Sequence, residues 1–273
     1  MLTNAACCSN VRTRFQKISE VARLTPTRFS EDHSIMVDKR AICGARNNAD
    51  WYEIVFSAHG LKYQRQEHAF VAHDLPPPYY SKLTVLSPNQ AEAITKELIK
   101  LAKQFDGVLG LKDSFCQLDL TDNGFETLFE ATWIWRSARA SHMPDDWEIV
   151  RHPNDLAHWE DSWKSNGSPE QLRMFPASLL NRDEVFFLGR RRNGRFDSGC
   201  IANRSSDCVG LFNVFAEQPS QHSFSQAADA VSAICGELPI VGYESGDELS
   251  FAELSSFDLV GPLRILVTRT AKF

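Results

Sequence analysis

Several common signatures are missing from this chain of 273 residues. Its seven cysteines contain no CxxC pair, and their odd number argues against a disulfide framework or a zinc ribbon. No apolar stretch reaches about 18 residues, so no membrane span is expected, and the N-terminus lacks the apolar core of a signal peptide. GxGxxG, GxxxxGK[ST], HExxH and GxSxG motifs are also absent. A cytoplasmic protein with reduced cysteines is the simplest interpretation.

The chain also lacks a large excess of charge of either sign. The formal net charge is −6, with 17 Lys+Arg against 16 Asp+Glu in residues 1–143 and 12 against 19 in residues 144–273. Neither nucleic acid nor a membrane is therefore expected as a partner. Three arginines at 190–192 form the only dense basic run, which is either a solvated hairpin tip or a contact for an anion. His68 and His73 make no recognisable zinc pattern, so no metal is expected.

What the chain does have is enough apolar material for a folded core, with 43% hydrophobic and 11% aromatic residues. Residues 1–45 are polar and lack periodicity, so a poorly ordered N-terminal tail is expected. Met36 is a second candidate for the start of the protein. A polar linker at 137–146 divides the remainder into segments 46–140 and 147–273, which we interpret as two domains.

The first segment predicts helices and strands in alternation. A helix is expected over 49–59, where apolar residues recur at helical spacing and Gly60 ends the pattern. The apolar stripe within 88–105 predicts the clearest helix of the chain. Strands are expected at 83–86, 108–112 and 126–136.

The second segment predicts a longer series of elements. Asn193-Gly194 between two apolar runs is a strong hairpin signal. Strands are expected at 147–150, 185–191, 196–202, 209–215, 239–243 and 263–267. Helices are expected between 156 and 163 and over 223–234 and 249–254, and a broken or short helix over 172–180 because of Pro176.

The order of these elements resembles the fold of the GCN5-related N-acetyltransferase (GNAT) superfamily. Over 147–269 the order is complete, and residues 247–263 are similar to the family's last helix, turn and final strand, with Ser256 in place of a glycine. The first segment resembles only the C-terminal part of that fold. The resemblance implies an α+β fold, a central mixed sheet flanked by helices, in a tandem GNAT-like protein whose first copy is incomplete.

Such a fold implies an acetyl-CoA site in the second copy. The pantetheine arm would lie between the strands at 209–215 and 239–243, and the pyrophosphate at the start of the next helix. The residues implied in cofactor binding are Phe212, Asn213, Val214 and Phe215 in the strand and Gln221, His222, Ser223, Phe224 and Ser225 at the helix start. Tyr243 and Glu244 follow in the neighbouring strand and are implied as general acid and base.

One part of the family's pattern is missing. Its phosphate loop reads Gln/Arg-x-x-Gly-x-Gly/Ala, because glycine lets the backbone approach the phosphates. Residues 217–225 contain no glycine, arginine or lysine, and Pro219 removes a backbone donor. Two functions therefore stay open. One is an acyltransferase that moves an acetyl or acyl group from acyl-CoA to a small-molecule or peptide amine, and the other is a non-catalytic GNAT-like module that binds a ligand or partner.

The implied site residues each have a structural interpretation as well. Tyr243 is alternatively an aromatic strand end, and Glu244 a solvated carboxylate. Asn213 either faces a ligand or bonds to a neighbouring bulge. Tryptophans near the domain junction either pack the core or line a pocket between the halves.

Overall fold

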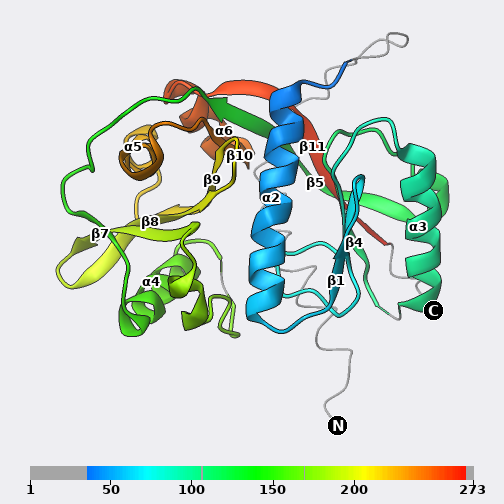
Figure 1. Ribbon diagram of the computed structural model, residues 1–273, viewed down its shortest axis with the longest axis horizontal. Helices are drawn as coiled ribbons and strands as arrows, with labels where there is room; N and C mark the ends of the chain where they lie inside the picture. Colours follow the sequence, from blue (N-terminus) through cyan, green and yellow to red (C-terminus); the bar gives the residue numbers. More distant parts are fainter. Residues whose placement is uncertain (1–35, 106, 169, 269–273) are drawn as a thin grey trace.

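A single mixed sheet of eleven strands runs through the chain in the computed structural model, which describes residues 36–268 except 106 and 169 (Figure 1). In spatial order the strands are β1 (Tyr63–Arg65), β2 (Ala69–Ala72), β3 (Leu83–Val85), β4 (Gly110–Asp113), β11 (Asp258–Thr268), β5 (Phe125–Arg136), β10 (Ile240–Glu244), β9 (Val209–Ala216), β8 (Arg195–Arg204), β7 (Val185–Arg192) and β6 (Trp147–Ile149). The mixed sheet confirms the expected fold class.

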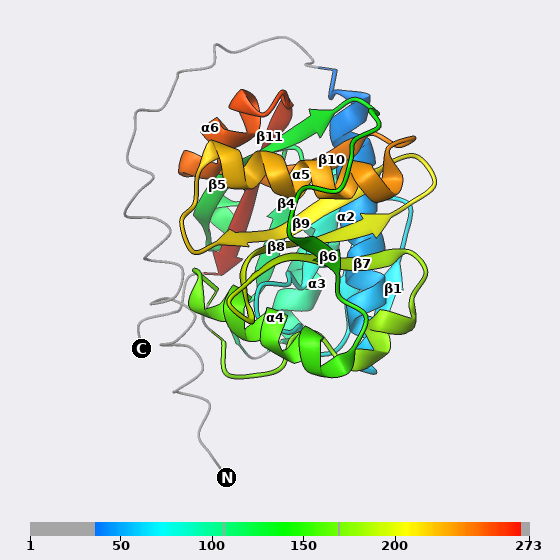
Figure 2. The same cartoon turned by 90° about the vertical axis from the view of Figure 1, so that its left-hand side faces the viewer.

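Five α-helices and two short 3-10 turns cover the faces of this sheet in the described residues. They are α2 (Lys39–Ala58), α3 (Ala91–Gln104), α4 (Pro153–Ser165), α5 (Gln221–Cys235), α6 (Gly246–Leu254), η1 (Thr121–Asn123) and η2 (Ala177–Asn181). On β7 to β9, α4 packs against one face and α5 against the other, as Figure 2 shows. None of the helices in this part of the chain is both long and apolar enough to cross a bilayer.

The helix α2 begins ten residues earlier than the spacing predicts. Asp38 caps it by accepting a hydrogen bond from the Arg40 backbone N–H, so residues 39–45, assigned to the N-terminal tail, are helical instead. Its first turns bury small residues such as Ala41 and Gly44, which give no strong apolar stripe. A Cβ on Gly44 would lie 2.9 Å from the Trp133 ring, so this helix sits close to the sheet. The first 35 residues lie outside the described residues.

The sheet is continuous across the two segments because β5 and β11 lie side by side. β11, the last strand, pairs antiparallel with both β4 and β5. β5 in turn pairs antiparallel with β10, where Tyr243 lies opposite Trp133. The helix α2 runs along the middle of the molecule and contacts strands of both segments (Figure 1). The division into two domains at 137–146 stays a prediction.

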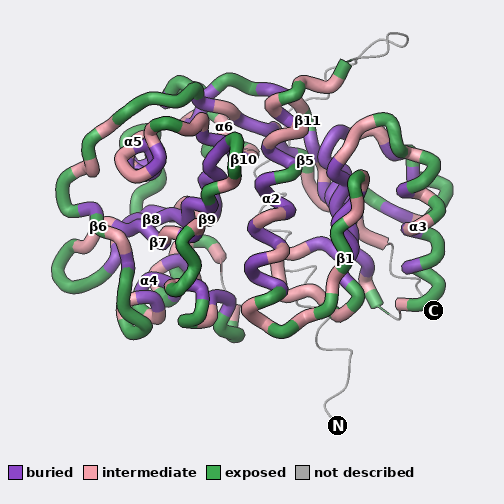
Figure 3. The backbone as a smooth tube through the Cα atoms, viewed as in Figure 1, coloured by how far each residue is buried: buried purple, intermediate pink, exposed green. Residues whose placement is uncertain are grey.

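The buried side chains form three core clusters. Trp159 and Trp163 pack with Phe175 below β7 and β8, Trp133 packs with residues of β4 and β11, and Trp147 packs with residues of α5. Tryptophans therefore fill all three clusters rather than line one shared pocket. Burial runs along the strands and along α2, whereas α3 is largely exposed (Figure 3).

Candidate functional site

The two parallel strands β9 and β10 pair only at their first residues. Ile240 lies opposite Val209 and Val241 opposite Gly210, and these are the only pairs between the two strands in the described sheet. Both strands then run on, β9 for six further residues and β10 for three. We call this unpaired stretch the β9–β10 gap, and it lies where the resemblance places the pantetheine arm.

A β-bulge in β9 accompanies the separation. Asn213 and Val214 together lie opposite a single residue of β8, between the pairs made by Phe212 and Phe215. Asn213 has a φ of 52°, a left-handed conformation that asparagine tolerates better than most residues. The extra residue lets Phe212 and Phe215 pack in the same core cluster although they are three positions apart.

Burial changes at the same point along both strands. The residues in the paired ends are buried, whereas the bulge and the end of β10 are half-buried at Asn213, Val214, Tyr243 and Glu244. Beyond Leu211, the described sheet shows no pairing of β9 with β10. Peptide-like N–H and C=O groups in such a position favour the addition of an extended chain that carries amides of its own.

Tyr243 lies on the face of β10 that meets α2. Its ring contacts the Trp133 ring edge-on, with 5.4 Å between centroids. The Lys112 ammonium donates a hydrogen bond to its hydroxyl oxygen over 3.2 Å. Burial raises the pKa of Tyr243, and the charge of Lys112 opposes that rise. The phenol is therefore protonated at neutral pH and available as a proton donor.

Glu244 lies on the opposite face of β10, because neighbouring residues of a strand alternate. Burial raises the pKa of this carboxyl group to about 8, and the nearby charge of Glu248 on α6 adds to the effect. The group is therefore largely protonated at neutral pH, and its ionised form, which becomes populated as the pH approaches about 8, is a stronger base than an ordinary glutamate. Glu244 is half-buried, and its role as a base stays a prediction.

The start of α5 is built from serines rather than glycines. Ser220 caps the helix, and the side chains and backbones of Ser220 and Ser223 bond to each other in a capping box. Gln221 and His222 follow at the exposed first turn, with Gln221 donating to the Leu254 carbonyl over 3.3 Å. The capping box uses the Ser223 backbone N–H, so fewer amides remain for an anion than in a glycine-rich loop.

Arginines of the β7–β8 hairpin face this loop across a pocket of about 340 Å³. Arg190 is fixed by Asp197 through two nitrogen–oxygen contacts of 2.8 and 3.0 Å. Arg192 and Arg195 remain exposed by 59% and 79% of their side-chain surface. The cationic groups that the loop lacks in sequence are thus present on its other side.

Three of the residues implied in cofactor binding have side chains that pack in the hydrophobic core. Phe212 stacks on Trp51 at 6.4 Å, Phe215 meets Trp159 at 5.1 Å, and Phe224 meets Phe257 at 5.7 Å. Only their backbone groups can therefore meet a ligand in this arrangement. Ser225, one turn into α5, is half-buried.

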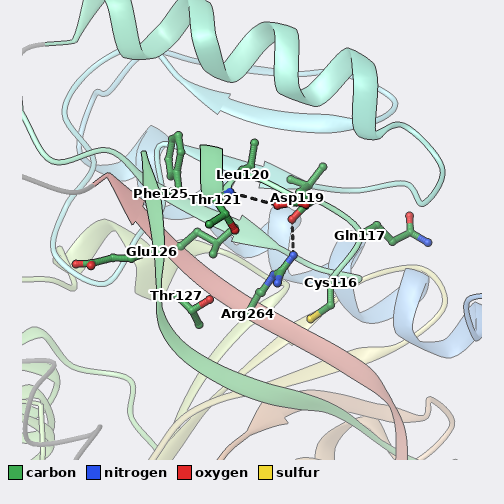
Figure 4. Close-up of a pocket in the computed structure, with 11 residues that line it drawn as sticks. Cys116, Gln117, Asp119, Leu120, Thr121, Phe125, Glu126, Thr127 and Arg264 are labelled. Atoms are coloured by element: carbon green, nitrogen blue, oxygen red, sulfur yellow. Dashed lines mark hydrogen bonds between the residues drawn. The ribbon is translucent and has the colours of Figure 1, made fainter. Parts of the chain in front are cut away.

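The first segment has a hollow of its own, of about 440 Å³, between the chain after β4 and the ends of β5 and β11 (Figure 4). Arg264 lines it but is held by the buried Asp113, at 3.1 Å, and by the Leu118 carbonyl. Burial raises the pKa of Cys116 to about 12, so its thiol stays protonated. This hollow offers no activated nucleophile, and β3 ends at Val85 without a gap like that of β9 and β10.

Lys112, Asn48 and Arg195 are site residues that sequence reasoning did not select, whereas the arginines at 190–192 were already named as either a hairpin tip or a contact for an anion. Lys112 ends the strand expected at 108–112, and the residues after it have the pattern of a turn. The only indication in the sequence that its side chain is buried is the apolar strand that precedes it. Asn48 belongs to the part of α2 that lacks an apolar stripe. Among the residues that the structure describes, no group of three or more His, Cys, Asp or Glu side chains is arranged to hold a metal.

Comparison with family models and with curated proteins gives no match. Solved structures do match. A GCN5-related N-acetyltransferase from Kribbella flavida is 11% identical, with a TM-score of 0.59 over 84% of this chain and 96% of that one. A putative GNAT-family acetyltransferase from Novosphingobium aromaticivorans is 12% identical, with a TM-score of 0.52 over 88% and 100%. Saccharomyces cerevisiae N-myristoyltransferase with bound myristoyl-CoA is 10% identical, with a TM-score of 0.50 over 92% and 86%.

These similarities define a GNAT fold. The gap between parallel strands lies in the segment 147–273, whose element order is that of this fold, and the tandem arrangement of two copies stays a prediction. The resemblance inferred from the order of elements is confirmed at the level of the fold.

Proposed function

We propose that the protein is an acyltransferase that moves an acetyl or other acyl group from acyl-CoA to the amine of a small molecule or peptide. The observation that carries this proposal is the β9–β10 gap, with no pairing of β9 with β10 beyond Leu211 and half-buried side chains at its end. The pantetheine arm would pair with β9 at Phe212 to Phe215 as an added strand and bring the thioester toward Tyr243 and Glu244.

In this reaction Glu244 acts as the proton acceptor and Tyr243 as the proton donor. In its ionised form, which is populated as the pH approaches its pKa of about 8, Glu244 accepts a proton from the attacking amine. The amine nitrogen bonds to the thioester carbon, and the C–S bond then breaks with its electron pair on sulfur. Tyr243 donates its phenolic proton to that sulfur. The two groups lie on opposite faces of β10, so they reach a carbon held in the gap from opposite sides.

The phosphates of the cofactor would lie at the start of α5, between Gln221 to Ser225 and the β7–β8 hairpin. The exposed guanidinium groups of Arg192 and Arg195 supply positive charge there, and the first amides of α5 supply donors. Asp197 and Glu217 offset part of this charge. We therefore expect weaker phosphate binding than a glycine-rich loop gives, with much of the affinity coming from the pantetheine arm.

Calorimetric titration with acetyl-CoA and with S-acetylpantetheine, which lacks the nucleotide, tests this proposal. Both should bind the wild-type protein. Replacing Arg192 and Arg195 by alanine should weaken acetyl-CoA binding by about tenfold and leave S-acetylpantetheine binding unchanged. The matched control is Arg182→Ala, an exposed arginine that pairs with Glu184 away from this pocket.

The outcome also separates the two functions left open by the sequence. Binding followed by acyl transfer to an amine supports the transferase. Absence of binding at millimolar acetyl-CoA and S-acetylpantetheine would overturn the proposal and favour a non-catalytic module that has lost the cofactor along with the glycine loop.

A further inference from the structure

One buried cation in the described part of the chain, the ammonium of Lys112, takes no part in an ion pair. Only 1% of this residue is exposed, and it reaches from β4 beneath α2 toward β10. Its Nζ donates to Asn48 Oδ1 over 2.7 Å and to the Tyr243 hydroxyl over 3.2 Å. The same nitrogen lies 4.4 Å from the centroid of the Tyr243 ring and 5.0 Å from that of Tyr52.

The ammonium of Lys112 has no carboxylate partner among the described residues. Burying a charge without a counter-ion is costly, and proteins rarely accept this cost without a functional reason. Here the cost is reduced by an amide oxygen, a phenol oxygen and two aromatic faces, which are neutral. The positive charge of Lys112 works against the burial that raises the pKa of Tyr243, while the charges of Tyr52 and Glu244 add to that rise.

The neighbouring acids point elsewhere. Asp113, the next residue of β4, lies on the other face and pairs with Arg264 at 3.1 Å. Glu244, the next residue of β10, also lies on the face away from Lys112. The titratable groups that do face Lys112 are Tyr243 from β10 and Tyr52 from α2. Trp133 of β5, which does not titrate, packs against the Tyr243 ring. The half-buried Tyr80 lies against Tyr52 at 4.7 Å between ring centroids, and Tyr243 adds to the rise in the pKa of Tyr80.

We propose that Lys112, held by Asn48, is a positioning residue that orients the Tyr243 phenol and stabilises the phenolate formed when it gives up its proton. This inference rests on the proposed transferase function. It makes the first segment a contributor to the site of the second, because Lys112 and Asn48 come from β4 and α2 and Tyr243 from β10.

The hydrogen-bond geometry explains the orientation. The Tyr243 oxygen accepts from Lys112, so its own hydrogen must point away from the ammonium. When the C–S bond of the thioester breaks, the electron pair goes to sulfur and the phenolic proton follows it, leaving a phenolate beside the ammonium. The proton that Glu244 took from the amine returns to the phenolate through solvent, so the site ends as it began.

The test is Lys112→Met, which keeps most of the side-chain length and removes the charge. The readout is the titration of Tyr243, followed by NMR of tyrosine labelled with carbon-13 at Cζ and assigned with Tyr243→Phe. Removing the charge should raise the pKa of Tyr243, because the ammonium lowers it in the wild type. The turnover number should fall by at least about tenfold while acetyl-CoA affinity is unchanged, since Lys112 acts on the proton donor and not on the cofactor.

Lys82→Met is the matched control. Lys82 is also buried, with 4% exposed, and lies over an aromatic ring, but its Nζ donates to the backbone carbonyls of His73 and Asp74. This control should leave the Tyr243 titration and the turnover number unchanged. Lys112→Arg, which keeps the charge, should restore most of the turnover.

A second variant keeps the inference testable if Lys112→Met does not fold. Asn48→Asp places a carboxylate beside the ammonium and should raise the pKa of Tyr243 in the same direction. A Tyr243 titration unchanged in the variant that folds would overturn the inference. Failure of the wild-type protein to bind acetyl-CoA would instead overturn the proposed function, and the NMR titration would still decide whether Lys112 acts on Tyr243.

Discussion

Replacing Glu244 by glutamine should stabilise the protein at alkaline pH. Burial raises the pKa of this carboxyl from its ordinary value of 4.5 to about 8, so the folded protein prefers it protonated. At about 1.36 kcal/mol for each pH unit, this difference corresponds to at most about 5 kcal/mol, and less where water reaches the half-buried carboxylate. Glutamine has the shape of the protonated acid and carries no charge to bury.

The sign follows from proton binding. Between about pH 4.5 and pH 8 the folded state holds a proton on Glu244 that the unfolded chain has lost, so the wild-type free energy of unfolding falls as pH rises. Above about pH 8 both states are ionised and this contribution becomes constant. Glu244→Gln should therefore gain stability over the wild type through this window and differ little from it below pH 4.5.

Urea denaturation at about pH 5 and about pH 8.5 measures the effect. The wild type should lose stability between the two values by clearly more than Glu244→Gln. Glu253→Gln, which removes an exposed carboxylate from α6, is the matched control and should follow the wild type. Parallel pH dependence in the wild type and Glu244→Gln would show that Glu244 titrates like an ordinary carboxylate, and its role as a base near neutral pH would lose its support.

Three further substitutions test the packing around the site. Gly44→Ala should cost about 1–3 kcal/mol in urea denaturation, because its Cβ would lie 2.9 Å from the Trp133 ring. Asp113→Asn should cost about 2–4 kcal/mol, because it leaves the guanidinium of Arg264 without its buried carboxylate. Gly194→Ala should cost about 1 kcal/mol, because φ is 77° at this hairpin turn.

Exposed neighbours serve as controls for these three variants. Arg46→Ala on α2, Asp145→Asn in the linker and Arg192→Ala beside the hairpin turn should each change the free energy of unfolding by no more than about 0.5 kcal/mol. A Gly44→Ala or Asp113→Asn protein as stable as the wild type would show that the close approach of α2, or the Asp113–Arg264 pair, is absent in solution.

Local patterns in the sequence were sufficient for most elements of the second segment. Asn193-Gly194 forms the predicted turn, with both residues at positive φ. The apolar stripe predicted over 223–234 is the buried face of α5, which spans Gln221–Cys235. These signals are local, because turn conformation and helix periodicity depend on residues a few positions apart.

The arrangement of β5, β10 and β11 was not predictable in the same way. Which strands become neighbours depends on contacts between residues more than a hundred positions apart. The residues of one strand do not specify which other strand it pairs with. The contact between Lys112 and Tyr243 is a consequence of that arrangement. The early start of α2 was missed because its buried face consists of small residues such as Ala41 and Gly44, which lack the usual apolar signal.

Amide hydrogen exchange in β9, with and without saturating acetyl-CoA, tests the central claim most directly. If the cofactor enters the β9–β10 gap as an added strand, amides within Phe212 to Phe215 should exchange more slowly in its presence. Amides of β3, which pairs with β4 in the first segment, should not respond. Unchanged exchange over 212–215, with acetyl-CoA either unbound or protecting another part of the chain, would contradict the account.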